Sequence, residues 1–224
     1  MAVHISVMSG KLKGIPAINT NTLSNSFCQM MALSGKSDVI CSGGGDRPDC
    51  YSWSMLKGSR KNCVNKFEQN SVTLSTGYVE WADLPVFNSL WVRFHGHGEL
   101  VNETHFINFL QIAERNPRTT FSLFTKRKDI VKRVLQSIEW HGSTRASGQD
   151  VFIRKIPENL ILVYSNPIVG RITDKKPQYF HKVFNTTTEK STRDNCTGQK
   201  CIECLACYQF DGNSVLIEQK KKRA

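Results

Sequence analysis

The sequence has no apolar run long enough to span a bilayer, and its first residues lack the apolar core of a secretory signal peptide. We therefore expect no membrane partner and a cytoplasmic location, where thiols stay reduced and clustered cysteines usually bind metals. Internal repeats and low-complexity segments are also missing. The chain contains no Walker loop, no G-x-S-x-G elbow and no dinucleotide-binding fingerprint, so these three kinds of site are not expected.

Acidic residues are scarce relative to basic ones. The 224 residues include 19 Asp and Glu against 30 Lys and Arg, which gives a formal net charge of +11. A basic balance of this size favours polyanionic partners, namely nucleic acid or nucleotides. Apart from the tail at 220–223, the cations gather at 57–66, 126–133 and 182–193. Such runs fit a solvated surface equally well.

Cysteine, by contrast, is concentrated near the C-terminus. Four of the 8 cysteines follow the pattern C-x4-C-x2-C-x2-C, at Cys196, Cys201, Cys204 and Cys207. Cysteines with two residues between them can direct both sulfurs to one ion, a spacing that a hydrophobic core does not require. The pattern predicts a metal site and favours an iron–sulfur cluster over Zn, because three cysteines follow one another at intervals of three. The even count also fits four disulfides, the interpretation for an exported protein.

The other cysteines lie in the first third of the chain. Cys41 and Cys50 flank the glycine-rich segment SGGGDRPD, which predicts a loop able to bring their thiols together. They would complete the C-terminal metal site, form part of a second site, or be incidental loop residues. Cys28 and Cys63 each adjoin an apolar residue, and we expect them to be ordinary core cysteines.

Apolar patterning in the middle of the chain alternates between strand and helix. We expect strands at 90–94, 119–124, 160–164 and 182–184, helices at 51–74, 102–115 and 128–140, and loops at 10–30 and 141–150. The alternation predicts an α/β fold, either a partial barrel or an open, mostly parallel sheet with flanking helices, followed by a C-terminal cysteine-rich metal-binding element. We place the α/β domain, with its N-terminal arm and cysteine loop, at 1–195 and pack 196–224 onto it.

Chemically able polar residues follow three of these strands. They are His95, His97 and Glu99 after the first, Lys126 and Arg127 after the second, and Ser165 and Asn166 after the third. Because parallel strands end at the same edge of a sheet, we expect these residues to form a ligand pocket. If the first strand continued, its three residues would share a face and could bind a metal or serve acid/base catalysis. The intervening glycines favour instead a tight turn that lets the backbone approach a ligand, and a further alternative makes Glu99 a helix-capping residue. Lys126 and Arg127 would hold a phosphate or carboxylate.

Several segments resemble a family of bacteriophage proteins, the "gene product 88" domain group. They include GIPAINTNTLSNSFC, RFHGHGEL, NETHFINFLQIAERNPRTTFSLFTKR, PENLILVYSNP and CTGQKCIECLACY, in the same order as in the family. The resemblance implies a phage gene expressed in the host cytoplasm. Family members carry a compact C-x2-C-Y where this chain has Cys41 and Cys50 separated by GGGDRPD.

A more distant resemblance is to radical S-adenosylmethionine enzymes, in which a cysteine loop precedes a partial α/β barrel. HGHGEL resembles their Gly-Gly-Glu turn after the second strand, and Cys41 and Cys50 resemble an altered cysteine loop without the C-x3-C-x2-C spacing. The resemblance implies S-adenosylmethionine as a cofactor. Our hypothesis is therefore a phage-encoded metal-binding protein, with an iron–sulfur cluster and a pocket at the strand ends. The alternative is a Zn-stapled, non-enzymatic module that binds nucleic acid or a host protein.

Overall fold

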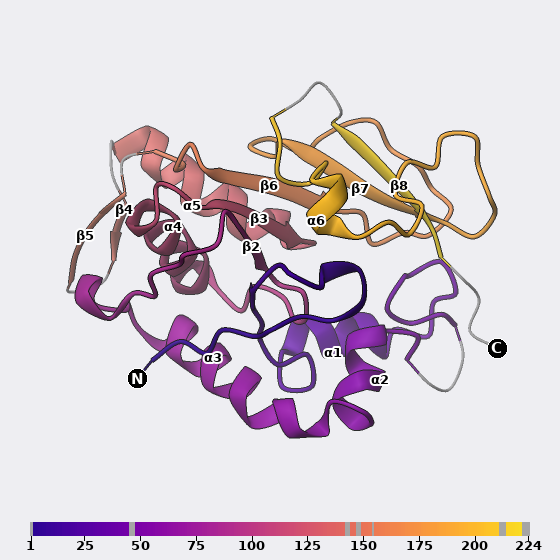
Figure 1. Ribbon diagram of the computed structural model, residues 1–224, viewed down its shortest axis with the longest axis horizontal. Helices are drawn as coiled ribbons and strands as arrows, with labels where there is room; N and C mark the ends of the chain where they lie inside the picture. Colours follow the sequence, from indigo (N-terminus) through magenta and orange to yellow (C-terminus); the bar gives the residue numbers. More distant parts are fainter. Residues whose placement is uncertain are drawn as a thin grey trace.

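Six parallel strands form the main sheet (Figure 1). The computed structural model describes residues 2–44, 48–141, 144–146, 149–153, 155–210 and 214–220. The strands are β1 (Ala17–Ile18), β2 (Trp91–Phe94), β3 (Thr120–Thr125), β6 (Leu160–Ser165), β7 (Lys182–Thr187) and β8 (Val215–Gln219). Their order in space equals their order in sequence, so each strand is added at the same edge. The sheet is open, with β1 and β8 as its edges.

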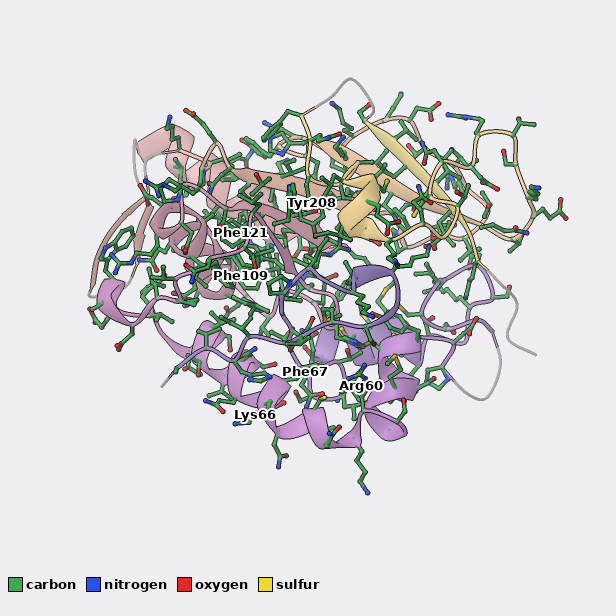
Figure 2. The ribbon with its side chains drawn as sticks, viewed as in Figure 1. Arg60, Lys66, Phe67, Phe109, Phe121 and Tyr208 are labelled. Carbon is green, nitrogen blue, oxygen red and sulfur yellow. The ribbon has the colours of Figure 1, made fainter. Side chains whose placement is uncertain are left out.

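One face of the sheet is covered by three helices: α3 (Val64–Thr76), α4 (Glu103–Arg115) and α5 (Lys128–His141). Strand register places Phe94 beside Leu123, and Leu123 beside Leu162, and all three side chains are fully buried under these helices. The ring of Phe109, on α4, stacks on that of Phe94 with 4.1 Å between centroids, and Phe121 lies in the same layer (Figure 2). This aromatic layer is the centre of the larger hydrophobic core.

The predicted middle of the chain is confirmed. All four expected strands are present, within one to three residues at their ends, and all belong to the parallel sheet. Helix α4 begins where expected, because the side chain of Asn102 accepts a hydrogen bond from the backbone N–H of His105. On α5, the expected buried positions are indeed buried: Ile130, Val131, Val134, Leu135 and Ile138.

Three segments differ from the predictions. Residues 10–30 are not a plain loop: they contain η1 (Gly10–Leu12), β1 and α1 (Ser26–Ala32). The helix expected at 51–74 is broken into α2 (Tyr51–Lys57), η2 (Lys61–Cys63) and α3, with Gly58 ending the first piece. Within the described part of 141–150, β4 (Thr144–Ala146) pairs with β5 (Gln149–Ile153), so the loop prediction is wrong there.

The second face of the sheet carries a smaller apolar cluster. It contains Ile161, Val163 and Leu216, with Ala206 and Cys207 of the C-terminal segment packed against them. That segment includes the short helix α6 (Cys201–Cys204), which lies in front of β6 and β7 in Figure 1. The cysteine-rich segment therefore covers the side of the sheet that α3, α4 and α5 leave free. The remaining helical turn is η3 (Trp81–Asp83), and no helix among the described residues is long and apolar enough to cross a membrane.

Candidate functional site: thiols at the strand ends and on the second sheet face

His95, His97 and Glu99 do not share a face. Strand β2 ends at Phe94, and His95 takes a positive φ of 63°, which turns the chain out of the strand direction. The alternation that would align the three side chains is lost at that residue. The acid/base constellation expected from an extended strand is therefore wrong as a geometry, and each residue has its own surroundings.

Glu99 is a structural carboxylate at the carboxyl end of the sheet. It is 3 % exposed. One of its oxygens accepts hydrogen bonds from the backbone N–H of Leu100, at 2.9 Å, and from the hydroxyl of Thr125. The other accepts from the backbone N–H of Lys126, at 2.8 Å. Both oxygens are thus used to join the loop after β2 to the end of β3, and the helix that follows Glu99 is capped by Asn102 instead, so the capping alternative is wrong for Glu99.

The two histidines are buried against different helices. The ring of His95 packs edge-on against those of His105 and Phe109, 5.2 and 5.1 Å away, and burial followed by the neighbouring His105 keeps its pKa well below the usual range. The ring of His97 lies 3.0 Å from the Ser52 hydroxyl through its Nδ1. Burial, and then the charge of Arg60, lower the pKa of His97 to about 4. Both rings are therefore neutral at pH 7.

Of the two expected anion-binding cations, only Lys126 points into the site. The Arg127 guanidinium makes an ion pair with Asp129 and donates to the Leu100 carbonyl, so it holds the start of α5 in place. Lys126 instead acts on three of the four cysteines in the first third of the chain, Cys28, Cys41 and Cys50. Although burial opposes the effect, the negative charges of Cys41, Glu99 and Cys28 raise the pKa of the Lys126 ammonium above its usual range.

Ser165 and Asn166 lie at the end of β6, as expected. The Asn166 side chain donates to the Arg171 carbonyl and to Asn185 Oδ1, and it accepts from the backbone N–H of Ile168. Its polar atoms therefore fix the turn after β6, and it is not presented to a ligand. Ser165 is 8 % exposed and contributes a buried strand end.

Cys28, Cys41 and Cys50, here called the rim thiols, gather at the carboxyl ends of the strands. Each is held there by a neighbour in sequence. Asn25, which caps α1, donates to the Glu99 carbonyl; the N–H of Ile40 donates to the Pro167 carbonyl, 2.9 Å away; and the Tyr51 hydroxyl donates to the Gly96 carbonyl. The N–H of Asp49 also donates to the Ser42 carbonyl, which closes the loop between the last two thiols.

The rim thiols act on one another. The Cys41 thiol donates a hydrogen bond to the Cys50 sulfur, which lowers the pKa of Cys50 and raises that of Cys41. The N–H of Trp53 and the charge of Lys126 further lower the pKa of Cys50. Burial, then Glu99, raise the pKa of Cys28, and Cys41 adds to the effect. Cys41 and Cys50 therefore meet as expected, but with Cys28, which we had expected to be a core residue and which is only partly buried.

Cys196, Cys201, Cys204 and Cys207, here called the C-terminal thiols, surround one cavity of about 30 Å³ on the second face of the sheet. Phe184 and Leu216 form its floor. Two side-chain N–H groups reach the sulfurs: Gln199 Nε2 lies 3.4 Å from Cys204 Sγ, and Lys11 Nζ lies 3.8 Å from Cys196 Sγ. The four cysteines that share a sequence pattern thus also share a cavity.

Arg93 supplies positive charge beside these thiols. Its guanidinium lies 3.2 Å from the centre of the Phe124 ring on the second face, and its Nε donates a hydrogen bond to the His95 carbonyl, 3.4 Å away. Burial raises the pKa of Cys207 to about 12, and Arg93 opposes the rise. Burial likewise raises the pKa of Cys201, against Arg93 and Lys11.

Sequence reasoning missed Lys11, Cys28, Arg93 and Gln199 as members of these sites. Arg93 did leave a trace, because it is a charged residue between Val92 and Phe94 in a buried strand. Lys11 left none, since only the folded chain brings it to Cys196, 185 positions away. Cys63 lies outside both groups and contacts Asn62.

In the described part of the chain, no group of three or more His, Cys, Asp or Glu side chains is arranged to hold a single metal ion. As the side chains stand, neither the rim thiols nor the C-terminal thiols form a mononuclear site. Comparisons of the chain with models of protein families, with curated proteins and with solved structures found no match.

Proposed function

We propose that this protein binds iron–sulfur clusters through its two groups of thiols. The observation that carries the proposal is the single cavity lined by Cys196, Cys201, Cys204 and Cys207. Four thiolates are the usual ligands of a cubane cluster. N–H groups directed at cluster sulfurs are a general means of stabilising and tuning such a centre, and Gln199 and Lys11 are in place to supply them.

A cluster fits the C-terminal thiols better than a single Zn ion does. Zn needs four sulfurs about 2.3 Å from one point. The four thiols instead stand around a cavity, and no three of the described metal-ligating side chains are arranged for one ion. A cubane is held at its corners by four thiolates and is larger than the present cavity of about 30 Å³, so the C-terminal segment would have to open to admit it. The Zn-stapled module remains the alternative and predicts a colourless protein.

The rim thiols support a second site with a different property. Only three cysteines gather there, so a four-iron cluster would keep one corner free of protein ligands. Three features match what the resemblance to radical S-adenosylmethionine enzymes implies: strands in sequential order, thiols following the first strand, and the Gly-His-Gly-Glu turn after the second. We propose that Cys28, Cys41 and Cys50 would hold the cluster and that S-adenosylmethionine would bind beside it, where the chemistry supplied by the bound groups would be one-electron transfer.

The chain's own groups have defined tasks in this site. Lys126 carries positive charge against the rim thiolates and lowers the cost of keeping them ionised. Glu99 fixes the turn that brings Gly96 and the Tyr51 hydroxyl together. His95 and His97 are neutral packing groups, so we assign them no proton transfer. The phage origin and the host cytoplasm stay predictions.

Anaerobic purification with iron and sulfide analysis tests the proposal. We expect a brown protein whose visible absorption bleaches with dithionite. Cys204→Ser should lose one cluster and keep the other, Cys50→Ser should do the reverse, and Cys63→Ser is the control that keeps both. A folded, colourless protein that contains only Zn, or no metal, would overturn the proposal.

A further inference from the structure

The surface formed by α2, η2 and the start of α3 is basic and free of acid. Between Cys50 and Glu68 the chain carries Lys57, Arg60, Lys61 and Lys66 and no Asp or Glu. Lys57 and Lys61 are exposed. Figure 2 shows Arg60 and Lys66 along the side of the molecule made by α2 and α3, away from Tyr208 and the C-terminal segment. We call these residues the basic surface.

The cations of the basic surface are not neutralised by carboxylates. In the ranges that the structure describes, Lys57, Lys61 and Lys66 make no ion pair, and Arg60 donates to the hydroxyl of Ser9, 2.6 Å away. Glu68, the next acid along the chain, is bound to Asn21 and Ser24. Cations that no carboxylate neutralises attract a polyanion, whose counterions are released when it binds.

Aromatic rings connect the basic surface to the rim thiols. Tyr51 follows Cys50 directly, is 48 % exposed, and is fixed by its hydroxyl on Gly96 and by the His97 ring 5.1 Å away. On the same helix, the Lys57 ammonium lies 4.9 Å from the centre of the partly exposed Trp53 ring. Exposed rings next to cations are the usual platform for unpaired bases, each stacked base being worth about 1–3 kcal/mol.

We infer that the basic surface binds single-stranded nucleic acid, with phosphates on Lys57, Lys61 and Lys66 and bases toward Tyr51. Because α2 starts at a rim thiol, a strand bound there ends at the proposed reaction site. The idea that the bound strand is the substrate rests on the proposed function, whereas the binding of the strand to the basic surface does not. Single strands are favoured over duplex because paired bases cannot stack on Tyr51 or Trp53, and over an acidic protein because neither ring would then be used.

Fluorescence anisotropy with labelled single-stranded DNA and RNA of about 16 nucleotides tests the binding. The test variant is Lys57→Gln/Lys61→Gln. The matched control is Lys175→Gln/Lys176→Gln, which removes the same charge from exposed lysines between β6 and β7. Each phosphate contact contributes a slope of about 0.7 to log K against log salt, so the test variant should lose about 1.4 from the slope. Between 50 and 200 mM salt its affinity should then fall about sevenfold less than that of the wild type.

The outcomes separate this inference from the proposed function. Equal slopes for the test and control variants, or equal affinity for a duplex of the same length, would overturn it. Trp53→Leu should weaken single-strand binding at all salt concentrations, and an unchanged affinity also counts against the inference. Binding is repeated with Cys50→Ser, which removes the proposed rim cluster but none of the cations. We expect Cys50→Ser to lose iron and to keep binding. Unchanged iron content with intact binding would overturn the proposed rim cluster alone, and a wild-type protein that contains both clusters but binds no single strand would overturn this inference alone.

Discussion

Substitutions of Glu99 test whether its carboxylate has a structural or a chemical role at the carboxyl ends of the strands. Its carboxylate accepts from two backbone N–H groups, those of Leu100 and Lys126, and from the Thr125 hydroxyl, in a site that is 3 % exposed. In Glu99→Ala both N–H groups lose their acceptor. A buried donor without a partner costs about 1–3 kcal/mol, so the free energy of unfolding should fall by about 2–6 kcal/mol.

Glu99→Gln is the graded variant. The amide keeps one oxygen acceptor but places an NH2 group against the second N–H, so only one donor is orphaned and the expected loss is about 1–3 kcal/mol. Thr125→Val leaves one backbone donor, the N–H of Arg127, without its acceptor, and should therefore cost less than Glu99→Ala, which leaves two. Urea unfolding under anaerobic conditions, followed by far-UV circular dichroism, measures the free energy of unfolding of all three variants. The slope of this free energy against urea concentration should be the same for each.

The order of the losses decides the question. If Glu99→Ala were as stable as the wild type, the carboxylate would not be the joint between β2 and β3, and the structural assignment would be wrong. If Glu99→Gln kept full stability and yet lost all turnover of S-adenosylmethionine, the carboxylate would have a chemical role that the hydrogen bonds conceal.

Two further perturbations test the same region. His97 has a folded pKa of about 4 against an ordinary value near 6.5, so the unfolded chain binds more protons between these pH values. Its contribution to stability is complete above pH 6.5 and is lost as pH falls to 4, a drop of about 3 kcal/mol that should shrink in His97→Gln. Gly98 has φ +92°, and a Cβ there would meet the Thr20 hydroxyl and lie 2.5 Å from its carbonyl, so Gly98→Ala should cost about 3 kcal/mol or more. Gly77→Ala, where an added Cβ meets nothing within 4 Å, should change the unfolding free energy by less than about 1 kcal/mol, and equal effects at the two glycines would contradict the structure.

Long periodic segments were predictable from the sequence because their burial repeats. Helix α5 buries five apolar side chains at helical spacing, and β6 is apolar through almost its whole length, which left few alternatives for either. Strand β1 could not be found in this way. It has two residues, Ala17 and Ile18, and it is a strand only because β2 pairs with it. Strand β8 carries polar residues at its end and depends likewise on β7.

The two groups of thiols differ in the same way: one was predictable from local sequence spacing and the other depends on the folded chain. The C-terminal thiols lie within twelve positions, so their local spacing predicted a shared site, and they do line one cavity. The rim thiols are separated by loops, and Cys28 joins them only because Asn25 ties α1 to the Glu99 carbonyl. The alignment of His95, His97 and Glu99 required a strand that continued past Phe94, whereas Gly96 and Gly98 favoured a turn, and the structure shows the strand ending at Phe94. A single residue with positive φ reverses that inference, and no periodicity reveals it.

The sequential strand order has a consequence for how the molecule is built during translation. The ribosome releases β1 first and β8 last, so the sheet can extend by one edge without leaving a gap for a later strand. The helix-covered face of the sheet can be complete before the C-terminal segment covers Ile161 and Val163 on the second face. Until the C-terminal segment has been synthesised, the incomplete protein exposes these apolar side chains to solvent. Covering this apolar surface is therefore the last step in building the sheet, because the segment that covers it is synthesised after β7.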